Sequence, residues 1–407
     1  MGMSPLRILW VKVGGLWPPN TGGRLRSLHM IDELSRRHRV GLVTTHSPGA
    51  GSAELERRLP ACERIDSISY ALPKQGTLRF ARDVAQSWTS RYPADLWRWR
   101  VPAVRARIRE RMAEGVDLCV ADFLVAMPNL PASTSVPIVL FEHNVEHMIW
   151  KRLHQVEKRS WRRALLAVEW RKMRRYEAEA CTRAGLTVAV SEADRALLTV
   201  CAPGADIRAI PTGVDTSYFH PNGAAEAPAT LVFTGSMDWY PNEDAILYFL
   251  DAILPQVRRE VPDVSLAVVG RDPTERLRAA AAAAGVRVTG TVADVRPYVA
   301  EAAVYVVPLR VGGGTRLKIF EALAMGKAVV STRIGAEGLP IVSDRHFLQA
   351  DTPAAFAQAV ISLLKDSGRR RALGLAGRRL VEERYSWSRV TGEFEGHCRE
   401  LASRHAR

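Results

Sequence analysis

The sequence has few cysteines and no long apolar run. No stretch reaches the roughly 18 consecutive apolar residues of a membrane-spanning helix, so we expect none. The first 15 residues contain an apolar run that Lys12 interrupts, and no small-residue cleavage site follows, so we do not expect a signal peptide. No C-x-x-C pair occurs, which argues against disulfides and a zinc site and favours free thiols in a reducing cytoplasm. The five scattered cysteines are Cys62, Cys119, Cys181, Cys201 and Cys398.

Several short catalytic motifs are also missing. The chain has no G-x-x-x-x-G-K-[ST] phosphate loop, no G-x-G-x-x-G fingerprint with a ribose-binding acid, and no G-x-S-x-G elbow. No D-x-D pair lies in a loop, and the histidines show no metal-ligand spacing. We therefore expect no metal site and no cofactor.

The composition is that of a globular protein with an uneven charge. The chain has 407 residues, 47% hydrophobic and 25% charged, which predicts two domains, or three. Its net charge is +14, and residues 1–200 hold twelve more Lys and Arg than Asp and Glu, against two more in residues 201–407. This asymmetry suggests an acidic partner for the first half; the plainer explanation is a soluble, arginine-rich surface.

The first half follows the order strand, glycine loop, helix, strand. The apolar run 7–13 precedes the loop 14–23, a helical pattern covers 24–37, and 40–45 is the next strand. This order predicts a βαβ unit in a parallel sheet. We expect further strands at 116–122 and 136–144, and a strand running into a helix over 186–194.

The second half repeats this order. We expect an N-terminal domain at 1–209, a Pro- and Gly-rich linker at 210–230, a second domain at 231–385, and a last helix in 386–407. The expected strands are 231–236, 264–270, 286–292, 303–309 and 328–332, and the expected helices are 242–260, 274–285 and 315–325. Both halves are therefore predicted to be doubly wound α/β domains.

The most informative segment is GGGTRLKIFEALAMGKAVVS, residues 312–331. A glycine loop before a helix lets the backbone approach an anion, and Thr315 is the expected N-cap. Arg316 and Lys318 fall in the first helical turn, where the helix dipole disfavours cations unless an anion is bound there. Glu321 lies one turn beyond Lys318, where it could accept hydrogen bonds from sugar hydroxyls. The alternative is that the two cations are solvated and that Glu321 pairs with Lys318.

This segment resembles the C-terminal signature of the family 4 retaining glycosyltransferases, which have the GT-B fold. Other segments resemble the family in the same order: IPTGVDTSYFHP its linker, FTGSMDWYPNEDA the start of the nucleotide domain, and RYSW the start of a last helix that returns to the first domain. GSMDWYPN, FEHNVE and GGGTRLKIFEALAMG resemble the branch associated with bacterial exopolysaccharide assembly. The implied fold is two Rossmann-like domains facing a cleft.

The resemblance assigns roles position by position. Glu321 matches the second Glu of the family's E-x7-E pair and would bind the ribose, whereas the first Glu is replaced by Gly313. The amides of Gly313, Gly314 and Thr315, in the loop that starts at Gly312, would take over its contact with the donor sugar. Gly235 allows close approach at a strand end.

The family's basic pair has no counterpart in GSMDWYPNED, so Arg316 and Lys318 are its expected substitutes. Gly22 and Gly23 match the loop facing the diphosphate and acceptor, and His143 matches a histidine near the donor sugar. The plainer alternatives are a helix start at the two glycines and a structural role for His143; Glu142 and Glu146 rank below it.

The resemblance implies an enzyme that moves a sugar from a nucleoside diphosphate sugar to a lipid-linked or saccharide acceptor, with retention and without a metal. A nucleotide-sugar epimerase and a non-catalytic nucleotide-sugar-binding scaffold remain alternatives, and a nucleic-acid-binding role has no supporting motif. Segments 91–111 and 151–175 are rich in arginine and tryptophan, which suits an anionic membrane surface or else merely solvated helices. The expected location is the cytoplasm, at the inner face of the membrane.

Overall fold

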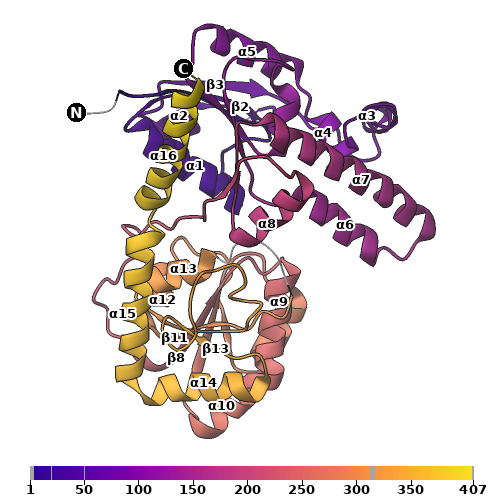
Figure 1. Ribbon diagram of the computed structural model, residues 1–407. Helices are drawn as coiled ribbons and strands as arrows, with labels where there is room; N and C mark the ends of the chain where they lie inside the picture. The colour runs from indigo at the N-terminus through magenta and orange to yellow at the C-terminus, as the bar shows by residue number, and fades with distance from the viewer. Residues whose placement is uncertain (1–3, 20, 50, 312–316, 406–407) are drawn as a thin grey trace. The chain divides into compact units, whose positions relative to one another are not determined.

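The computed structural model describes residues 4–19, 21–49, 51–311 and 317–405. The chain divides into two compact units (Figure 1). Unit 1 comprises Met1–Pro211 and Val390–Arg407, and unit 2 comprises Thr212–Arg389. Each unit is built on one parallel sheet, which confirms the predicted α/β class with two doubly wound domains.

The sheet of unit 1 has the strand order β3-β2-β1-β4-β5-β6-β7. Every residue of β4, β5 and β6 is buried, as expected where helices cover both faces of a parallel sheet. The strands are β1 (Arg7–Lys12), β2 (Arg39–His46), β3 (Arg64–Ser69), β4 (Leu118–Asp122), β5 (Ile138–Phe141), β6 (Leu186–Ala189) and β7 (Ile207–Ala209).

The helices of unit 1 include two that form a long hairpin, α6 and α7. The last helix of the chain also packs in this unit, where Phe394 contacts the rings of Trp10 and Phe141. The helices are α1 (Gly22–Ser35), α2 (Ala53–Arg58), α3 (Leu78–Trp88), α4 (Ala94–Arg98), α5 (Pro102–Ala113), the 3₁₀ helix η1 (Leu124–Asn129), α6 (Glu146–Val156), α7 (Ser160–Arg183), α8 (Glu192–Cys201) and α16 (Trp387–His405).

The sheet of unit 2 has the order β10-β9-β8-β11-β12-β13. Its strands are β8 (Ala227–Thr234), β9 (Ser265–Val269), β10 (Arg287–Val288), β11 (Ala302–Val307), β12 (Ala328–Ser331) and β13 (Leu348–Gln349). Its helices are α9 (Tyr240–Tyr248), the π turn η2 (Phe249–Ile253), α10 (Leu254–Glu260), α11 (Glu275–Ala283), α12 (Arg296–Glu301), α13 (Leu317–Ala324), α14 (Pro353–Lys365) and α15 (Ser367–Arg384).

Three predicted elements of unit 2 differ from the structure. The expected helix 242–260 is interrupted by the π turn, because Pro255 has no N–H to continue the regular hydrogen-bond ladder. The expected strand 286–292 contains only Arg287–Val288, and Gly290, with φ of 70°, turns the chain soon after it. β8 begins at Ala227, four residues before the strand was expected.

Both sheets have a point at which the strand order reverses. In unit 1 it lies between β1 and β4, and in unit 2 between β8 and β11. Helices that follow the two central strands leave in opposite directions, which opens a crevice at the carboxyl ends of the strands. This geometry indicates where each unit would bind a ligand.

Candidate functional site

In unit 2, Gly235 follows β8 and Gly270 follows β9, and the two glycines are in contact at the carboxyl ends of these strands. A Cβ on Gly270 would lie 1.7 Å from the carbonyl oxygen of Gly235, so no larger residue fits there. A Cβ on Gly235 would lie 2.7 Å from Nδ2 of Asn242 and 2.9 Å from Nζ of Lys318. Gly235 therefore faces an amide and an ammonium group at the strand end.

Contacts with Asn242 and Phe233 help to hold Lys318 over this edge. Its Nζ donates a hydrogen bond of 2.8 Å to Oδ1 of Asn242, and it lies 4.0 Å from the centre of the Phe233 ring. Asn242 in turn donates through Nδ2 to the carbonyl oxygen of Ser236, at 2.8 Å. The lysine is thus a fixed cation in the first turn of α13.

Glu321 lies one turn further along α13. Burial raises the pKa of its carboxyl to about 7, and the nearby charge of Lys318 opposes this rise only in part. A desolvated carboxylate beside a fixed cation at the end of a sheet is what a ligand with hydroxyl and anionic groups would engage.

Two residues of this edge were missed by sequence reasoning. Asn242 lies in the first turn of α9, and Arg271 follows β9, with its Nε donating to Oγ of Ser236 at 2.8 Å. The segment after the first strand of the domain, GSMDWYPNED, contains no cation, whereas Arg271 reaches Ser236 of this segment from the end of the neighbouring strand. Five predicted residues, Gly312, Gly313, Gly314, Thr315 and Arg316, lie outside the described residues.

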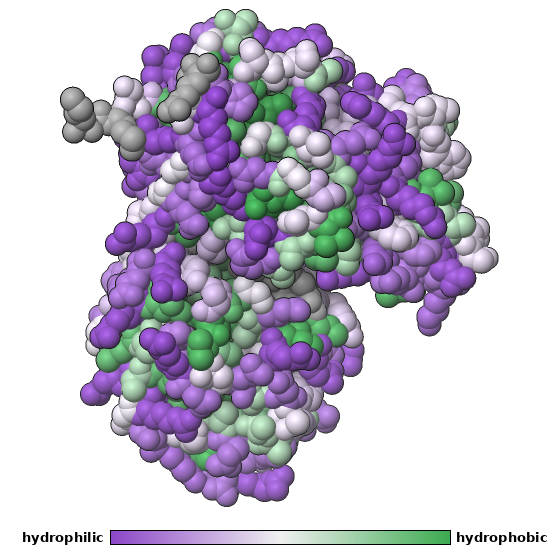
Figure 2. All heavy atoms as spheres, viewed as in Figure 1, coloured by the Kyte–Doolittle hydropathy of each residue, from purple (hydrophilic) through white to green (hydrophobic). Residues whose placement is uncertain are grey.

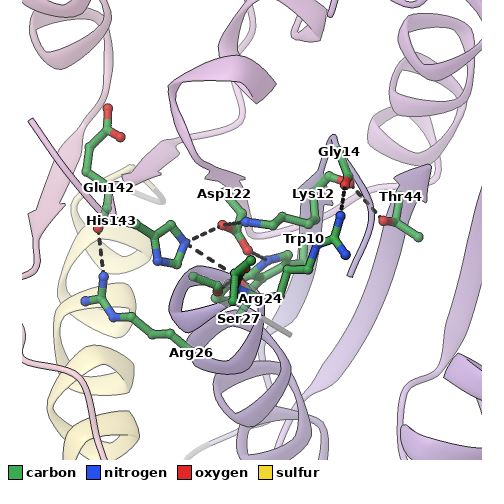
Figure 3. A network of polar contacts seen from close by, with 12 residues as sticks. Trp10, Lys12, Gly14, Arg24, Arg26, Ser27, Thr44, Asp122, Glu142 and His143 are labelled. Atoms are coloured by element: carbon green, nitrogen blue, oxygen red, sulfur yellow. Dashed lines mark hydrogen bonds and ion pairs between the residues drawn. The ribbon is translucent and has the colours of Figure 1, made fainter. Parts of the chain in front are cut away.

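The carboxyl ends of β1, β4 and β5 in unit 1 carry a second polar cluster (Figure 3). Asp122 is fully buried, and its Oδ1 lies 2.8 Å from Nζ of Lys12 and 2.8 Å from Nε2 of His143. The indole Nε1 of Trp10 donates to Oδ2 of Asp122 at 2.7 Å. Lys12 and Asp122, at the ends of two apolar strands, were also missed by the sequence analysis.

Burial and the charge of Lys12 determine the protonation states of Asp122 and His143. Burial alone would raise the pKa of Asp122, but Lys12 and the hydrogen bond from His143 outweigh it and hold that pKa well below its usual range. Burial, together with the charge of Lys12, lowers the pKa of His143 to about 3. The histidine is therefore neutral at physiological pH. Its Nε2–H group donates a hydrogen bond to the Asp122 carboxylate, which leaves Nδ1 as an acceptor.

The two glycines at the start of α1 lie beside this histidine. Gly22 and Gly23 are the first two residues of the helix, and the side chain of Thr21 caps it by accepting from the amide of Arg24. A Cβ on Gly23 would lie 3.5 Å from Nδ1 of His143. The structure thus brings Gly23 and the acceptor nitrogen of His143 together.

Glu142 points away from His143, as Figure 3 shows. Among the residues that the structure describes, neither oxygen of its buried carboxyl has a hydrogen-bond partner. Burial, with the nearby charge of Glu177, raises the pKa of this carboxyl well above the usual value. Its backbone carbonyl accepts a 2.7 Å hydrogen bond from Arg26. Burial likewise raises the pKa of Glu146 to about 7.

The two basic segments have different surroundings. In 91–111 the apolar side chains Leu96 and Ile108 lie in the core of unit 1, and Arg111 forms a 2.7 Å ion pair with Asp66. In 151–175, most of the side chains from Ser160 to Val168 are exposed.

Two kinds of feature are absent from the part of the chain that the structure describes. None of its helices is both long and apolar enough to cross a membrane. The described residues also contain no group of His, Cys, Asp and Glu side chains arranged to hold a metal ion.

Two family profiles match the chain over most of its length. The profile "Glycosyltransferase Family 4" matches residues 20–218, and "Glycosyl transferases group 1" matches residues 228–366. The chain belongs to the family 4, group 1 glycosyltransferases. The resemblance drawn from the sequence is thereby confirmed.

Curated relatives of this family 4 member include mannosyltransferases. A GDP-mannose-dependent alpha-(1-6)-phosphatidylinositol monomannoside mannosyltransferase of Mycobacterium tuberculosis is 29% identical over 48% of this chain and 57% of its own length. The chain thus spans about half the length of the mycobacterial relatives. A 44.6 kDa protein in the cps region of Klebsiella pneumoniae is 21% identical over 94% of this chain and 97% of its own.

Solved structures with the same fold include a sucrose-phosphate synthase from Thermosynechococcus elongatus. It has a TM-score of 0.68 at 16% identity and covers 98% of this chain and 100% of its own. The Anabaena protein HepE in complex with UDP has a TM-score of 0.65 at 13% identity, covering 97% and 100%. These likenesses establish the GT-B fold of this family 4 member.

Proposed function

We propose that this protein transfers a sugar from a nucleoside diphosphate sugar to an acceptor, with retention and without a metal ion. The observation that carries the proposal is the position of Lys318 at the glycine-lined end of β8, one helical turn before the buried carboxyl of Glu321. A cation and a hydroxyl acceptor one helical turn apart suit a diphosphate attached to a ribose. The GDP-mannose-dependent relatives support a nucleotide-sugar donor.

In this proposal each residue has a distinct role. Glu321 accepts hydrogen bonds from the ribose hydroxyls, and Gly235 lets the diphosphate come close to the backbone. Lys318, with Arg316 and the loop that begins at Gly312, balances the negative charge that grows on the leaving diphosphate. Such fixed charge stabilises the transition state more than the ground state, which lowers the barrier. The same charge would take the part that a metal ion plays in other transferases.

His143 is proposed to contact the sugar that is transferred. Because it is neutral, it would act by hydrogen bonding and not as an acid: Nδ1 would accept from a sugar hydroxyl while Asp122 holds Nε2. Gly22 and Gly23 would leave room for the acceptor and the diphosphate beside it. Lys12 and Trp10 fix Asp122 and so act as positioning residues.

The acceptor is proposed to be lipid-linked or a saccharide. The mycobacterial relatives are named for phosphatidylinositol mannosides, which are membrane lipids, and the Klebsiella relative lies in a cps region. The basic balance of residues 1–200 agrees with a protein that works in the cytoplasm at an anionic membrane surface.

The test is release of nucleoside diphosphate from a panel of nucleotide sugars, measured with EDTA and with and without candidate acceptors. We expect release to depend on an acceptor and to be lost in Glu321→Ala. An epimerase would change the sugar without any acceptor, and a scaffold would bind a nucleotide sugar without turnover. Either result would replace the transferase proposal.

A further inference from the structure

The helices α6 and α7 form a hairpin whose outer part has little support from the rest of unit 1. In α7 the buried residues begin at Glu169, whereas most of the preceding nine residues are exposed. Figure 1 shows the two helices running together beyond the sheet of unit 1 to their connecting turn. The hairpin is defined here as residues 149–168.

Polar and aromatic contacts of His154 join α6 to α7. The ring of His154 stacks on Trp170, with 6.0 Å between centroids and 13° between planes. Nδ1 of His154 also donates a 2.9 Å hydrogen bond to the carbonyl oxygen of Arg163. These contacts fix the pair of helices without using the apolar side chains that the hairpin leaves exposed.

Those exposed apolar side chains form one stripe on each helix. Ile149, Leu153 and Val156 of α6 follow a spacing of four and three residues, and so do Trp161, Leu165 and Val168 of α7. Val156 is 72% exposed and Trp161 is 60% exposed. Residues at this spacing lie on one helix face, so each helix presents a continuous apolar stripe to solvent.

Basic side chains surround the stripes. Glu157 is the only acidic residue between residues 149 and 168. The basic residues in this range are Lys151, Arg152, Lys158, Arg159, Arg162 and Arg163. The surface in Figure 2 correspondingly shows hydrophilic residues interspersed with hydrophobic ones over this side of unit 1. The basic surface continues along α7 to a hollow of about 300 Å³ that is lined by Arg171, Arg174 and Arg175.

We infer that this hairpin anchors the protein to anionic membranes by inserting both apolar stripes at the lipid interface while its Lys and Arg side chains bind lipid phosphates. Apolar insertion combined with a basic cluster provides two membrane signals, which a stable interfacial anchor needs. Tryptophan with basic neighbours also favours the headgroup level. This inference rests on the proposed function. It assigns the membrane contact to the hairpin and not to segment 91–111.

Two other occupants fit the surface less well. A second copy of the chain would bring two strongly basic hairpins together, and like charges repel. A nucleic acid would satisfy the cations, but its backbone offers no partner for stripes of Ile, Leu and Val. An anionic bilayer matches both the charge and the apolar side chains.

The experiment uses the full chain with vesicles of phosphatidylcholine alone and vesicles that also contain phosphatidylglycerol. The charge variant is Arg162→Glu with Arg163→Glu, and its matched control is Arg105→Glu with Arg109→Glu on α5, which changes the charge equally within segment 91–111. We expect the hairpin variant to lower the affinity for the anionic vesicles about thirtyfold and the control to retain it.

A second pair of variants tests insertion. Trp161→Ala with Leu165→Ser removes part of the stripe on α7, and Leu78→Ser with Trp88→Ala removes two similarly exposed side chains from α3. We expect about a tenfold loss from the first pair and none from the second. Brominated lipids should also quench a fluorescence component that Trp161→Phe removes.

Several results would overturn the inference. If the hairpin variants and their controls lost the same affinity for anionic vesicles, the hairpin would not be the membrane contact. The same conclusion would follow if the hairpin variants bound these vesicles as tightly as the wild type. Loss in the charge variant alone, without quenching of Trp161, would refute insertion. Binding to single-stranded DNA in preference to vesicles, lost in both hairpin variants, would assign the surface to a nucleic acid.

The inference and the proposed function fail separately. Nucleoside diphosphate affinity, measured in the same preparations, should be unchanged in the hairpin variants, and vesicle binding should be unchanged in Glu321→Gln. A protein that binds vesicles through the hairpin but binds no nucleotide would keep the inference and refute the proposed function.

Discussion

Replacing Glu321 by glutamine should make the protein more stable and a poorer nucleotide binder. Burial raises the pKa of this carboxyl to about 7, from 4.5 as its ordinary value. Between these two pH values the folded chain holds a proton that the unfolded chain has released. The free energy of unfolding therefore falls as the pH rises from 4.5 to 7. Above pH 7 the ionised carboxylate of Glu321 destabilises the folded state by about 3 kcal/mol.

Glutamine has the same shape and no charge, so Glu321→Gln removes most of this cost. We expect the melting temperature at about pH 8 to rise by several degrees, at most about 10 °C, and the difference to vanish near pH 4.5. The assay is a thermal melt of wild type and variant across pH, with Glu301→Gln, an exposed acid on α12, as the control. The control should show no such pH-dependent gain.

The same variant should bind a nucleoside diphosphate about ten to a hundred times more weakly, because a charged acceptor for the ribose hydroxyls is lost. Stability gained and affinity lost together are typical of a residue kept for binding. A lower melting temperature at pH 8, or unchanged affinity, would refute the reasoning and make Glu321 a structural residue.

Three further predictions concern the other polar groups. Lys318→Met should weaken binding of a nucleoside diphosphate about tenfold or more while leaving the affinity for the matching nucleoside unchanged, as calorimetry would show. His143→Ala should lower turnover at saturating donor without changing donor affinity; a purely structural histidine would instead lower the melting temperature of the apo protein. Asp122→Ala should destabilise the protein by about 3–5 kcal/mol in urea denaturation, because Lys12 stays buried without its partner, and Lys12→Met should recover part of this loss.

The sequence predicted the central strands well, because their apolar runs are buried on both faces. It did not predict β3, whose residues RIDSIS are mostly polar, or the three-residue β7. Such strands are defined by hydrogen bonds to their neighbours, which a local pattern does not contain. The π turn at Phe249–Ile253 was missed although Pro255 signals a break in the helix.

The candidate site was predictable where its residues lie in one segment. Lys318 and Glu321 share a helix, so spacing alone placed them together. Asn242 and Arg271 come from two other elements and meet at the strand end only through the sheet order, which the sequence does not spell out. Asp122 has a signal in the sequence, because it is a lone carboxylate at the end of an apolar strand, but it belongs to no short catalytic motif.

The most direct test of the account is a calorimetric titration with nucleoside diphosphates of different bases, in EDTA, of wild type and Lys318→Met. The account predicts that at least one diphosphate binds the wild type without a metal and binds the variant much more weakly. Absence of binding by every diphosphate, or equal binding by both proteins, would contradict a donor site at the strand ends of unit 2.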